Sequence, residues 1–226
     1  MKVIIFLLIS LFLLQAHCFK GSVYELNSNR GKLLYNIERT NNINDNKEFL
    51  SLVFKEPNGT LAVTEEAYFT DDQLTKYSVT YHRRNEKGLI EVKNGKVYFT
   101  YTKDGKTKTN DEKWVDNFIV GLSTNKFILK NWDALLDGKT LNVRFGVDYR
   151  RDTVGFNLFR TKETSLDIMT IKMKPSSFII SALVDPVYMD YDVKTKKLIA
   201  FRGRVRPKQN VNGKWKDLDG ETVYIW

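Results

Sequence analysis

The sequence predicts a mainly β protein: an antiparallel curved sheet or open barrel, with one or two short helices in the middle of the chain. Three observations lead to this fold class. Short runs of alternating apolar and polar residues recur along most of the chain. Turn-forming pairs such as Asn94-Gly95 and Asp104-Gly105 separate these runs. Between Trp114 and Leu136, in contrast, the apolar residues recur at roughly helical spacing.

The first strand-rich stretch extends from Val23 to Glu112. Its clearest strand carries Val97, Phe99 and Tyr101 on one face, which is the period of a half-buried strand. Strands of the same kind are expected at Leu33–Arg39, Phe49–Phe54, Leu61–Phe69 and Tyr77–Tyr81. Asn-rich or Pro-Asn-Gly segments separate them, so an antiparallel meander is expected.

The middle of the chain, Trp114 to Leu136, is predicted to form two short helices. Their apolar residues are Trp114, Phe118, Leu122, Phe127, Leu129, Trp132, Leu135 and Leu136. Ser123 can interrupt or cap them, and Gly138 is expected to end the second helix.

Strands resume after the helices. A hairpin is expected from Leu141–Asp148 and Val154–Arg160, turned at Arg150-Arg151-Asp152. Further strands are predicted at Leu166–Met173, Val187–Asp192, Leu198–Val205 and Glu221–Ile225. The apolar stretch Phe178 to Val184 suits either a strand or one or two helical turns, with Pro175 near its start. Because no linker or repeat divides the chain, we expect a single β-rich domain over residues 19–226.

The N-terminus is typical of a secretory signal peptide over residues 1–18. Lys2 precedes an uncharged apolar run from Val3 to Leu14, and Ala16 and Cys18 occupy the small-residue positions of a cleavage site. The run is shorter than the roughly 20 residues that a spanning helix needs. Acylation of Cys18 is an alternative, and it would tether the protein to a membrane. We favour cleavage after Cys18, because lipoprotein signals have a small residue where this chain has His17.

This leader predicts a secreted or periplasmic protein whose mature chain has no cysteine, since Cys18 is the only one. Such a chain has no disulfides, no thiol catalysis and no thiolate metal site. Calcium-binding loops of the Asp-x-Asp-x-Asp-Gly type are also absent from the sequence. We therefore expect no metal and no cofactor.

The formal net charge of +9 favours anionic partners. The partners that we consider are a lipid or other amphipathic small molecule, an envelope protein, and a peripheral contact with a membrane surface. Acidic residues are interspersed almost everywhere, so the charge also fits an ordinary solvated surface. Nucleic acid is not expected, because no helix has a basic face and no zinc-finger, RNP or KH motif occurs.

We expect no catalytic residue. His82, which adjoins Arg83 and Arg84, lacks the partners of a hydrolytic triad or a zinc site. Asp185, Asp190 and Asp192 lie close together in the sequence and are the acids that a glycan hydrolase would need. Their alternation with apolar residues is equally typical of an amphipathic strand, so the hydrolase remains a third hypothesis.

Two groups of residues are candidates for ligand binding. Period-two geometry places Arg202, Arg204 and Arg206 on one face of a strand, where guanidinium groups would bind phosphate or carboxylate. Alternatively, these arginines pair with carboxylates on a neighbouring strand. The other group would line an apolar cavity if a helix lay across a curved sheet, or would simply form core: Trp114, Phe127, Trp132 and Leu136.

Several segments of the C-terminal half resemble an uncharacterised exported bacterial all-β family. They are Asn131-Trp132-Asp133-Ala134-Leu135-Leu136-Asp137-Gly138-Lys139, Pro175-Ser176-Ser177, Val184-Asp185-Pro186 and Lys197-Leu198-Ile199-Ala200-Phe201-Arg202-Gly203. That family is similar in broad design to lipoprotein-carrier open barrels, in which a curved antiparallel sheet embraces helices and an apolar groove. The resemblance implies a groove-bearing fold and brings no catalytic motif.

These observations lead to a functional hypothesis. We expect an exported, non-enzymatic protein that binds a hydrophobic or amphipathic, anionic ligand, with an apolar interior and a basic rim. The alternative is an envelope interaction or structural module that presents a sheet face or edge to another protein, which predicts an exposed apolar patch.

Overall fold

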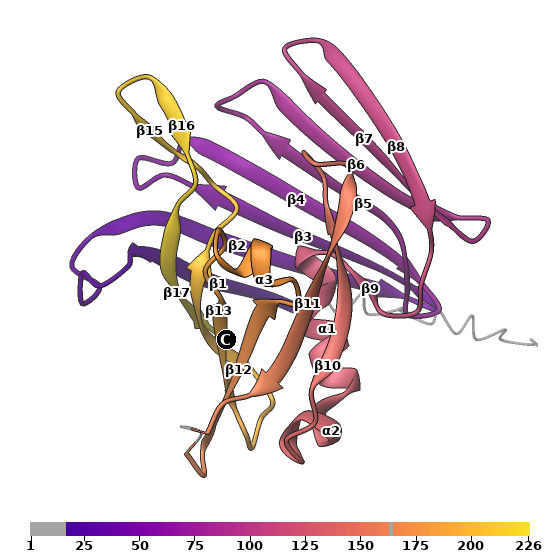
Figure 1. Cartoon of the computed structure of the whole chain (residues 1–226). Helices are drawn as coiled ribbons and strands as arrows, with labels where there is room; N and C mark the ends of the chain where they lie inside the picture. Colours follow the sequence, from indigo (N-terminus) through magenta and orange to yellow (C-terminus); the bar gives the residue numbers. More distant parts are fainter. Residues whose placement is uncertain (1–16, 163–164) are drawn as a thin grey trace, which may run out of the picture.

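The computed structural model describes residues 17–162 and 165–226. Its main feature is one 15-stranded sheet, strongly curved but not closed into a barrel (Figure 1). The strand order is β8-β7-β6-β5-β4-β3-β2-β1-β17-β14-β13-β12-β11-β10-β9. This confirms the predicted fold class, a mainly β, antiparallel curved sheet with a few short helices.

The strands have the following bounds: β1 (His17–Glu25), β2 (Leu33–Asn44), β3 (Lys47–Lys55), β4 (Leu61–Thr70), β5 (Gln73–Tyr81), β6 (Glu86–Lys93), β7 (Lys96–Lys103), β8 (Lys106–Lys113), β9 (Phe118–Ile119), β10 (Leu141–Val147), β11 (Asp152–Arg160), β12 (Ile168–Pro175), β13 (Val187–Asp192), β14 (Leu198–Arg204), β15 (Gln209–Val211), β16 (Lys214–Lys216) and β17 (Asp219–Ile225). All neighbours in the large sheet are antiparallel except β9 and β10. The expected meander is therefore present as β1 to β8.

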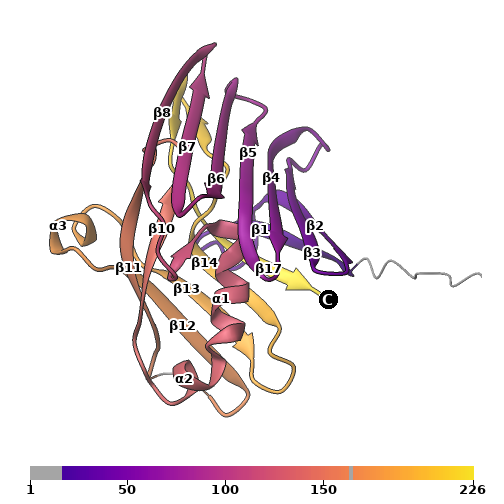
Figure 2. The same ribbon diagram turned by 90° about the vertical axis from the view of Figure 1, so that its right-hand side faces the viewer.

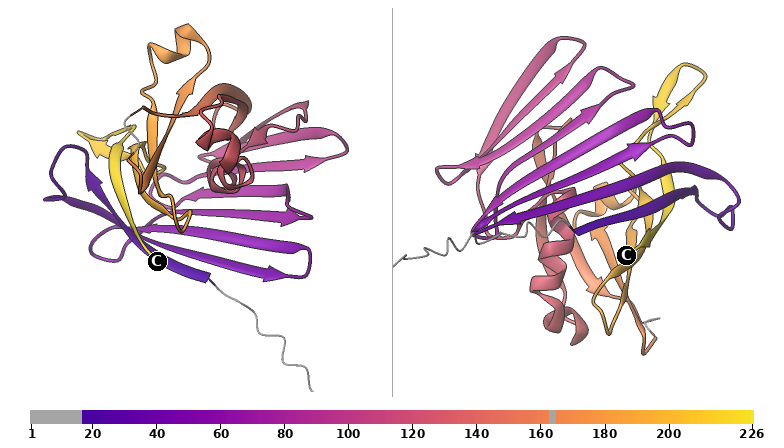
Figure 3. Two further views of the ribbon diagram at one scale, coloured as in Figure 1. Left: turned by 90° about the horizontal axis from the view of Figure 1, so that it is seen from below. Right: turned by 180° about the vertical axis from the view of Figure 1, so that it is seen from behind.

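The two ends of the described chain meet in the middle of the sheet. The last strand, β17, pairs with β1 on one side and β14 on the other, with Val23 opposite Thr222. Figure 3 shows the two halves curving away from this seam. Residues 1–16 of the predicted signal peptide lie outside the described residues. His17 and Cys18 belong to β1, and their backbones pair with Asn41 and Thr40 of β2.

Tight turns join most of the strands where the sequence predicts them. Asn94 and Gly95 both have positive φ, 52° and 71°, as a type I′ hairpin turn requires. Asp104-Gly105 repeats this geometry, with φ values of 49° and 76°. Arg151, at the predicted turn before β11, has a φ of 60°. The turn chemistry read from the sequence therefore fixes the hairpins.

The helical middle of the chain differs in part from the prediction. Two short helices do form, α1 (Thr124–Lys130) and α2 (Trp132–Leu136), and Gly138 follows α2 with a φ of 81°. The expected helix from Trp114 to Leu122 is wrong, because this segment runs extended through β9 into a 3₁₀ turn. Phe118, Ile119 and Val120 are buried in succession, which an extended segment enclosed on both faces allows and a helix face does not.

Two small elements complete the fold. The segment that suits either a strand or helical turns contains one helical turn, α3 (Phe178–Ser181). The hairpin of β15 and β16 is not predicted from the sequence, and it forms a separate two-stranded sheet.

The core is divided between the two halves of the sheet. One cluster lies inside the curve of the N-terminal strands and includes Leu50, Tyr77 and Phe99. The second packs α1 and α2 against β10 to β14 (Figure 2). Phe201 contacts both clusters, so the two cores are continuous.

The free edge of the N-terminal half approaches the β10–β11 hairpin without sheet pairing. The Glu112 side chain accepts hydrogen bonds from the Thr153 amide and hydroxyl, at 3.1 and 2.6 Å. The Asn110 amide donates to the Arg151 carbonyl at 2.9 Å. Side-chain bonds therefore take the place of the ladder that would close a barrel.

Candidate functional site

The four apolar residues that were predicted to line a cavity lie in different surroundings. Trp132 is 3% exposed and meets Tyr191 edge to face, with ring centroids 5.7 Å apart. Phe127 packs against the same C-terminal core, whereas Trp114 packs against the N-terminal core. Leu136 is 36% exposed. The structure therefore does not bring the four together around one cavity.

Two of the three predicted arginines pair with carboxylates on neighbouring strands. Arg202 forms an ion pair with Asp190 of β13, and Arg204 forms one with Asp219 of β17 at 2.8 Å. Arg204 also contacts Asp217 at 2.6 Å. This is the cross-strand arrangement that the sequence offers as the alternative to a ligand site.

Arg206 leaves the predicted row, because β14 ends at Arg204 and the chain beyond it turns inward. Its guanidinium lies 3.3 Å from Glu65 and 3.1 Å from Asp148, two acids that are nearly inaccessible to solvent. Tyr77 donates a hydrogen bond to Glu65, and Tyr81 donates one to Asp148 at 3.2 Å. We call these five residues the buried charge network; its acids are enclosed, and the Arg206 side chain is 16% exposed. The sequence patterns do not predict this network.

The network keeps its arginine charged. Burial alone would lower the pKa of Arg206, but Tyr77, Glu65, Tyr81 and Asp148 together raise it well above its ordinary value. Burial also raises the pKa values of Tyr77 and Tyr81, so both remain neutral donors. The Arg206 guanidinium thus lies between two carboxyl groups, and two phenol groups complete the hydrogen bonds.

The acids proposed for a glycan hydrolase are engaged separately. Asp190 accepts hydrogen bonds from Thr170 and Arg202. Asp192 accepts bonds from the amide and hydroxyl of Thr195, both at 2.6 Å. Asp185 is exposed.

His82, the candidate base of a triad, follows the end of β5, and its Nε2 lies 3.0 Å from the Thr64 hydroxyl. Within residues 17–162 and 165–226, no cluster of His, Cys, Asp or Glu has the arrangement of a metal site.

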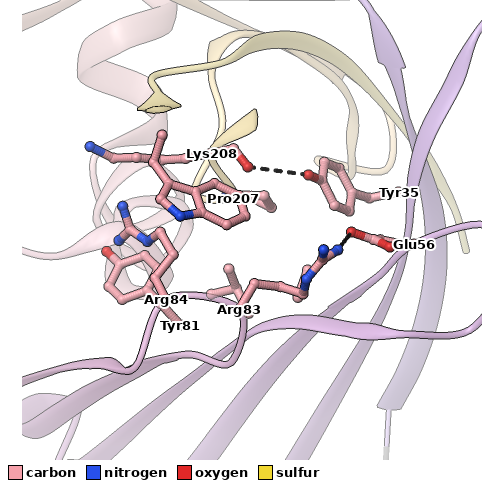
Figure 4. Close-up of a pocket in the computed structure, with 10 residues that line it drawn as sticks. Tyr35, Glu56, Tyr81, Arg83, Arg84, Pro207 and Lys208 are labelled. Carbon is pink, nitrogen blue, oxygen red and sulfur yellow. Dashed lines mark hydrogen bonds and ion pairs between the residues drawn. The ribbon is translucent and has the colours of Figure 1, made fainter. Parts of the chain in front are cut away.

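A groove and a pocket lie side by side at another place, between the β3–β4 turn and the segment that follows β14. The groove has a volume of about 370 Å³, and we call it the Tyr35 groove. It is lined by Leu33, Leu34, Tyr35, Glu56, Pro57, Asn58, Gln209 and Leu218. The pocket has a volume of about 20 Å³, and we call it the Arg84 pocket (Figure 4). It is lined by Tyr35, Glu56, Ala62, Val63, Tyr81, Arg83, Arg84, Pro207, Lys208 and Trp215. Tyr35 and Glu56 belong to both, so the two form one continuous site.

Local turn chemistry builds one wall of this site. The Pro57-Asn58-Gly59 segment turns because the Gly59 amide donates to the Glu56 carbonyl at 2.8 Å. The Asn58 side chain accepts the Thr60 amide at 3.0 Å, and Gly59 has a φ of 87°. The opposite wall is the chain from Pro207 to Gln209. The Tyr35 hydroxyl lies 3.5 Å from the Lys208 carbonyl, and it connects the two walls.

The polar end of the site is rich in hydrogen-bond donors. Arg84 stacks over the Tyr81 ring at 4.2 Å and forms an ion pair with Glu86 at 2.5 Å. Its side chain is 8% exposed, and its Nε has no hydrogen-bond partner. Arg83 forms an ion pair with Glu56 across the pocket (Figure 4). A buried donor without an acceptor carries a desolvation cost that no hydrogen bond offsets.

Sequence reasoning misses this site, because its walls come from several segments that lie far apart in the chain. The visible signals are the Pro57-Asn58-Gly59 turn and the adjacent Arg83 and Arg84, both read only as local features. Nothing in the alternation of β2 indicates that Leu33 and Leu34 meet residues after β14.

Comparisons with known proteins concern the fold alone. No family model matches the chain, and no curated protein matches it in sequence. Among solved structures, it is similar to a β-barrel-like protein of a domain of unknown function, DUF1849, from Brucella abortus. The identity is 6%, over 93% of this chain and 95% of that chain, with a TM-score of 0.47. A porin-like protein from Bacteroides uniformis matches at 8% identity, over 94% and 96% of the two chains, with a TM-score of 0.25. In the part of the chain that the structure describes, no helix is long and apolar enough to cross a bilayer.

Proposed function

We propose that this protein is an exported, non-enzymatic binding protein for an amphipathic ligand with an anionic head. In this proposal the apolar part of the ligand occupies the Tyr35 groove and the head occupies the Arg84 pocket. The observation that carries the proposal is the buried Arg84 Nε without a hydrogen-bond partner, on a residue that lines the pocket beside a partly apolar groove. The exported location depends on the signal-peptide pattern of residues 1–18.

The groove suits a hydrocarbon tail. Its volume of about 370 Å³ falls within the range of small-molecule sites. Leu34 packs against the N-terminal core, Leu218 is 6% exposed, and Leu33 at the rim is 36% exposed. Leu33 and Pro57 are the exposed apolar residues of the wall, and covering them with a tail gains free energy.

The pocket suits an oxygen-rich head group. Its cationic residues Arg83, Arg84 and Lys208 are donors and cannot accept hydrogen bonds. A phosphate or carboxylate head would accept from Arg84 Nε and would compete with Glu56 for Arg83. Planar guanidinium groups are well matched to both kinds of anion. The pocket has a volume of about 20 Å³, the space of about one water molecule, so one oxygen of the head enters it.

The experiment is calorimetric titration with two probes that share a tail, dodecyl phosphate and dodecanol, below their aggregation concentrations. The phosphate is expected to bind at one site and more tightly than the alcohol. Leu33→Asp is expected to weaken both probes, because it places a charge at the groove rim. Arg83→Gln is expected to weaken the phosphate only.

A matched control excludes general effects of adding a charge. Ile168 on β12 is 38% exposed, nearly the same as Leu33, and it lies far from the groove along the sheet. Ile168→Asp is expected to bind both probes like the parent protein. The proposal would be contradicted if neither probe bound at a single site. It would also be contradicted if Leu33→Asp and Ile168→Asp weakened probe binding equally.

A further inference from the structure

The β12–β13 connection exposes large apolar side chains on a short projection. Phe178 is 88% exposed, Ile179 is 75% exposed and Leu183 is 80% exposed, and we call these three residues the α3 tip. None of the residues in α3 is buried. Figures 2 and 3 show α3 standing clear of the rest of the fold. Contiguous apolar groups exposed on such a projection indicate an interaction surface.

The α3 tip has a defined backbone. The Ser181 hydroxyl donates to the Pro175 carbonyl at 3.0 Å, and the Ser181 amide donates to the Ser177 carbonyl at 2.9 Å. The Ser176 amide donates to the Gly155 carbonyl of β11 at 2.9 Å. These bonds hold the turn against the sheet while its apolar side chains face away from the core.

Basic residues without acidic partners lie beside the tip. On β12 the buried Ile171 and Met173 face the core, so Lys172 and Lys174 face outward. Their ammonium groups lie over aromatic rings, Lys172 over Tyr188 at 5.1 Å and Lys174 over Phe159 at 5.6 Å. In the described part of the chain, neither lysine forms an ion pair. Asp185 is the one acidic residue near the tip in the sequence.

We propose that the α3 tip docks this protein on an anionic lipid bilayer. Phe178, Ile179 and Leu183 enter the interface between head groups and acyl chains, and Lys172 and Lys174 face the negative surface. Apolar insertion combined with a basic flank is the usual arrangement of peripheral membrane contacts. The charge decides between this partner and a second copy of the chain, because two copies would bring the same lysines together. The inference is independent of the Tyr35 groove.

The test is co-sedimentation of the full protein with vesicles of phosphatidylcholine, with and without phosphatidylglycerol. The parent protein is expected to bind the vesicles that contain phosphatidylglycerol and to be released by high salt. Replacing all three tip residues by Ser is expected to lower the partition coefficient by roughly a hundredfold. Lys172→Gln with Lys174→Gln is expected to lower it by roughly tenfold.

Leu166 supplies the matched control. It is 97% exposed and lies at the opposite end of β12 from the tip, about 25 Å away along the strand. Leu166→Ser is expected to bind vesicles like the parent protein, and so is the groove variant Leu33→Asp. The vesicle test is therefore independent of the titrations, and either proposal can fail without the other.

Three results would overturn the inference. The first is that the parent protein binds neither type of vesicle. The second is that the triple Ser variant binds vesicles as well as the parent does. The third is that sedimentation velocity shows a dimer of the parent and a monomer of the triple Ser variant, with no difference in vesicle binding. That result would assign the tip to contacts between copies of the chain. Circular dichroism of each variant confirms that the fold is retained.

Discussion

The buried charge network predicts that the fold is sensitive to the loss of Arg206. Arg206→Met keeps a long apolar side chain but leaves Glu65 and Asp148 without their cation. Their side chains are 6% and 0% exposed, so water cannot replace it. Removing one partner of a buried ion pair costs about 3–5 kcal/mol. The expected result is a loss of that size in the free energy of unfolding.

The assay is urea denaturation followed by tryptophan fluorescence, with thermal melting as a second measure. For a chain of this length, such a loss lowers the melting temperature by roughly 10 °C. The control is Arg202→Met, because Arg202 is 37% exposed in its pair with Asp190. Exposed pairs contribute about 0–1 kcal/mol. Equal losses in the two variants would refute the argument from burial.

A second measurement tests the electrostatic cause directly. With Arg206 absent, Glu65 and Asp148 are enclosed carboxyl groups without a cation, and this uncompensated burial is the cause of the loss. Adding Glu65→Gln and Asp148→Asn is expected to recover most of the loss at pH 7.

Three further predictions follow from individual contacts. Gly88→Ala is expected to lower the melting temperature, because a Cβ there would lie 2.6 Å from the side chain of Asp148. Burial alone would raise the pKa of Asp217, but the hydrogen bond from Lys208 and the positive charges of Lys208, Arg204 and Arg84 together outweigh it and lower the pKa below its ordinary 3.8. That stabilisation is present above pH 3.8 and is lost as the pH falls through the folded pKa, so Asp217→Asn should flatten the acid limb of thermal melting plotted against pH. Trp132→Ala is expected to cost about 3–5 kcal/mol in urea denaturation, since its ring is enclosed in the C-terminal core. A cost below about 1 kcal/mol would instead fit a ring that lines an open cavity.

Much of the fold can be predicted from the sequence, because period-two alternation and turn chemistry act locally. β13 has the predicted bounds, Val187–Asp192, and the Asn94-Gly95 turn has the positive φ values of a type I′ hairpin. The β15–β16 hairpin is missed because strands of three residues are too short to show alternation. Its Asn212-Gly213 turn, with φ values of 52° and 80°, is the signal that could have identified it.

Spacing alone fails at Trp114–Leu122. Apolar residues four apart fit one face of a helix, yet they also fit an extended chain in which every fourth side chain packs into the core. The run Phe118-Ile119-Val120 distinguishes the two, because three successive apolar residues suit a short segment buried on both faces. The Tyr35 groove could not be predicted in the same way. Alternation assigns faces within a strand, whereas the groove depends on which loops meet across the sheet.

Arg206 shows where the period-two argument ends. Alternation places Arg202, Arg204 and Arg206 on one face only while the strand continues, and β14 stops at Arg204. Gly203 has a φ of 133°, outside ordinary strand geometry. A complementary signal exists in β4, where Glu65 occupies the inward position between Val63 and Ala67. An acid at an inward strand position needs a buried partner of opposite charge. Glu65 and an arginine beyond a strand end together predict an interior ion pair that neither pattern predicts alone.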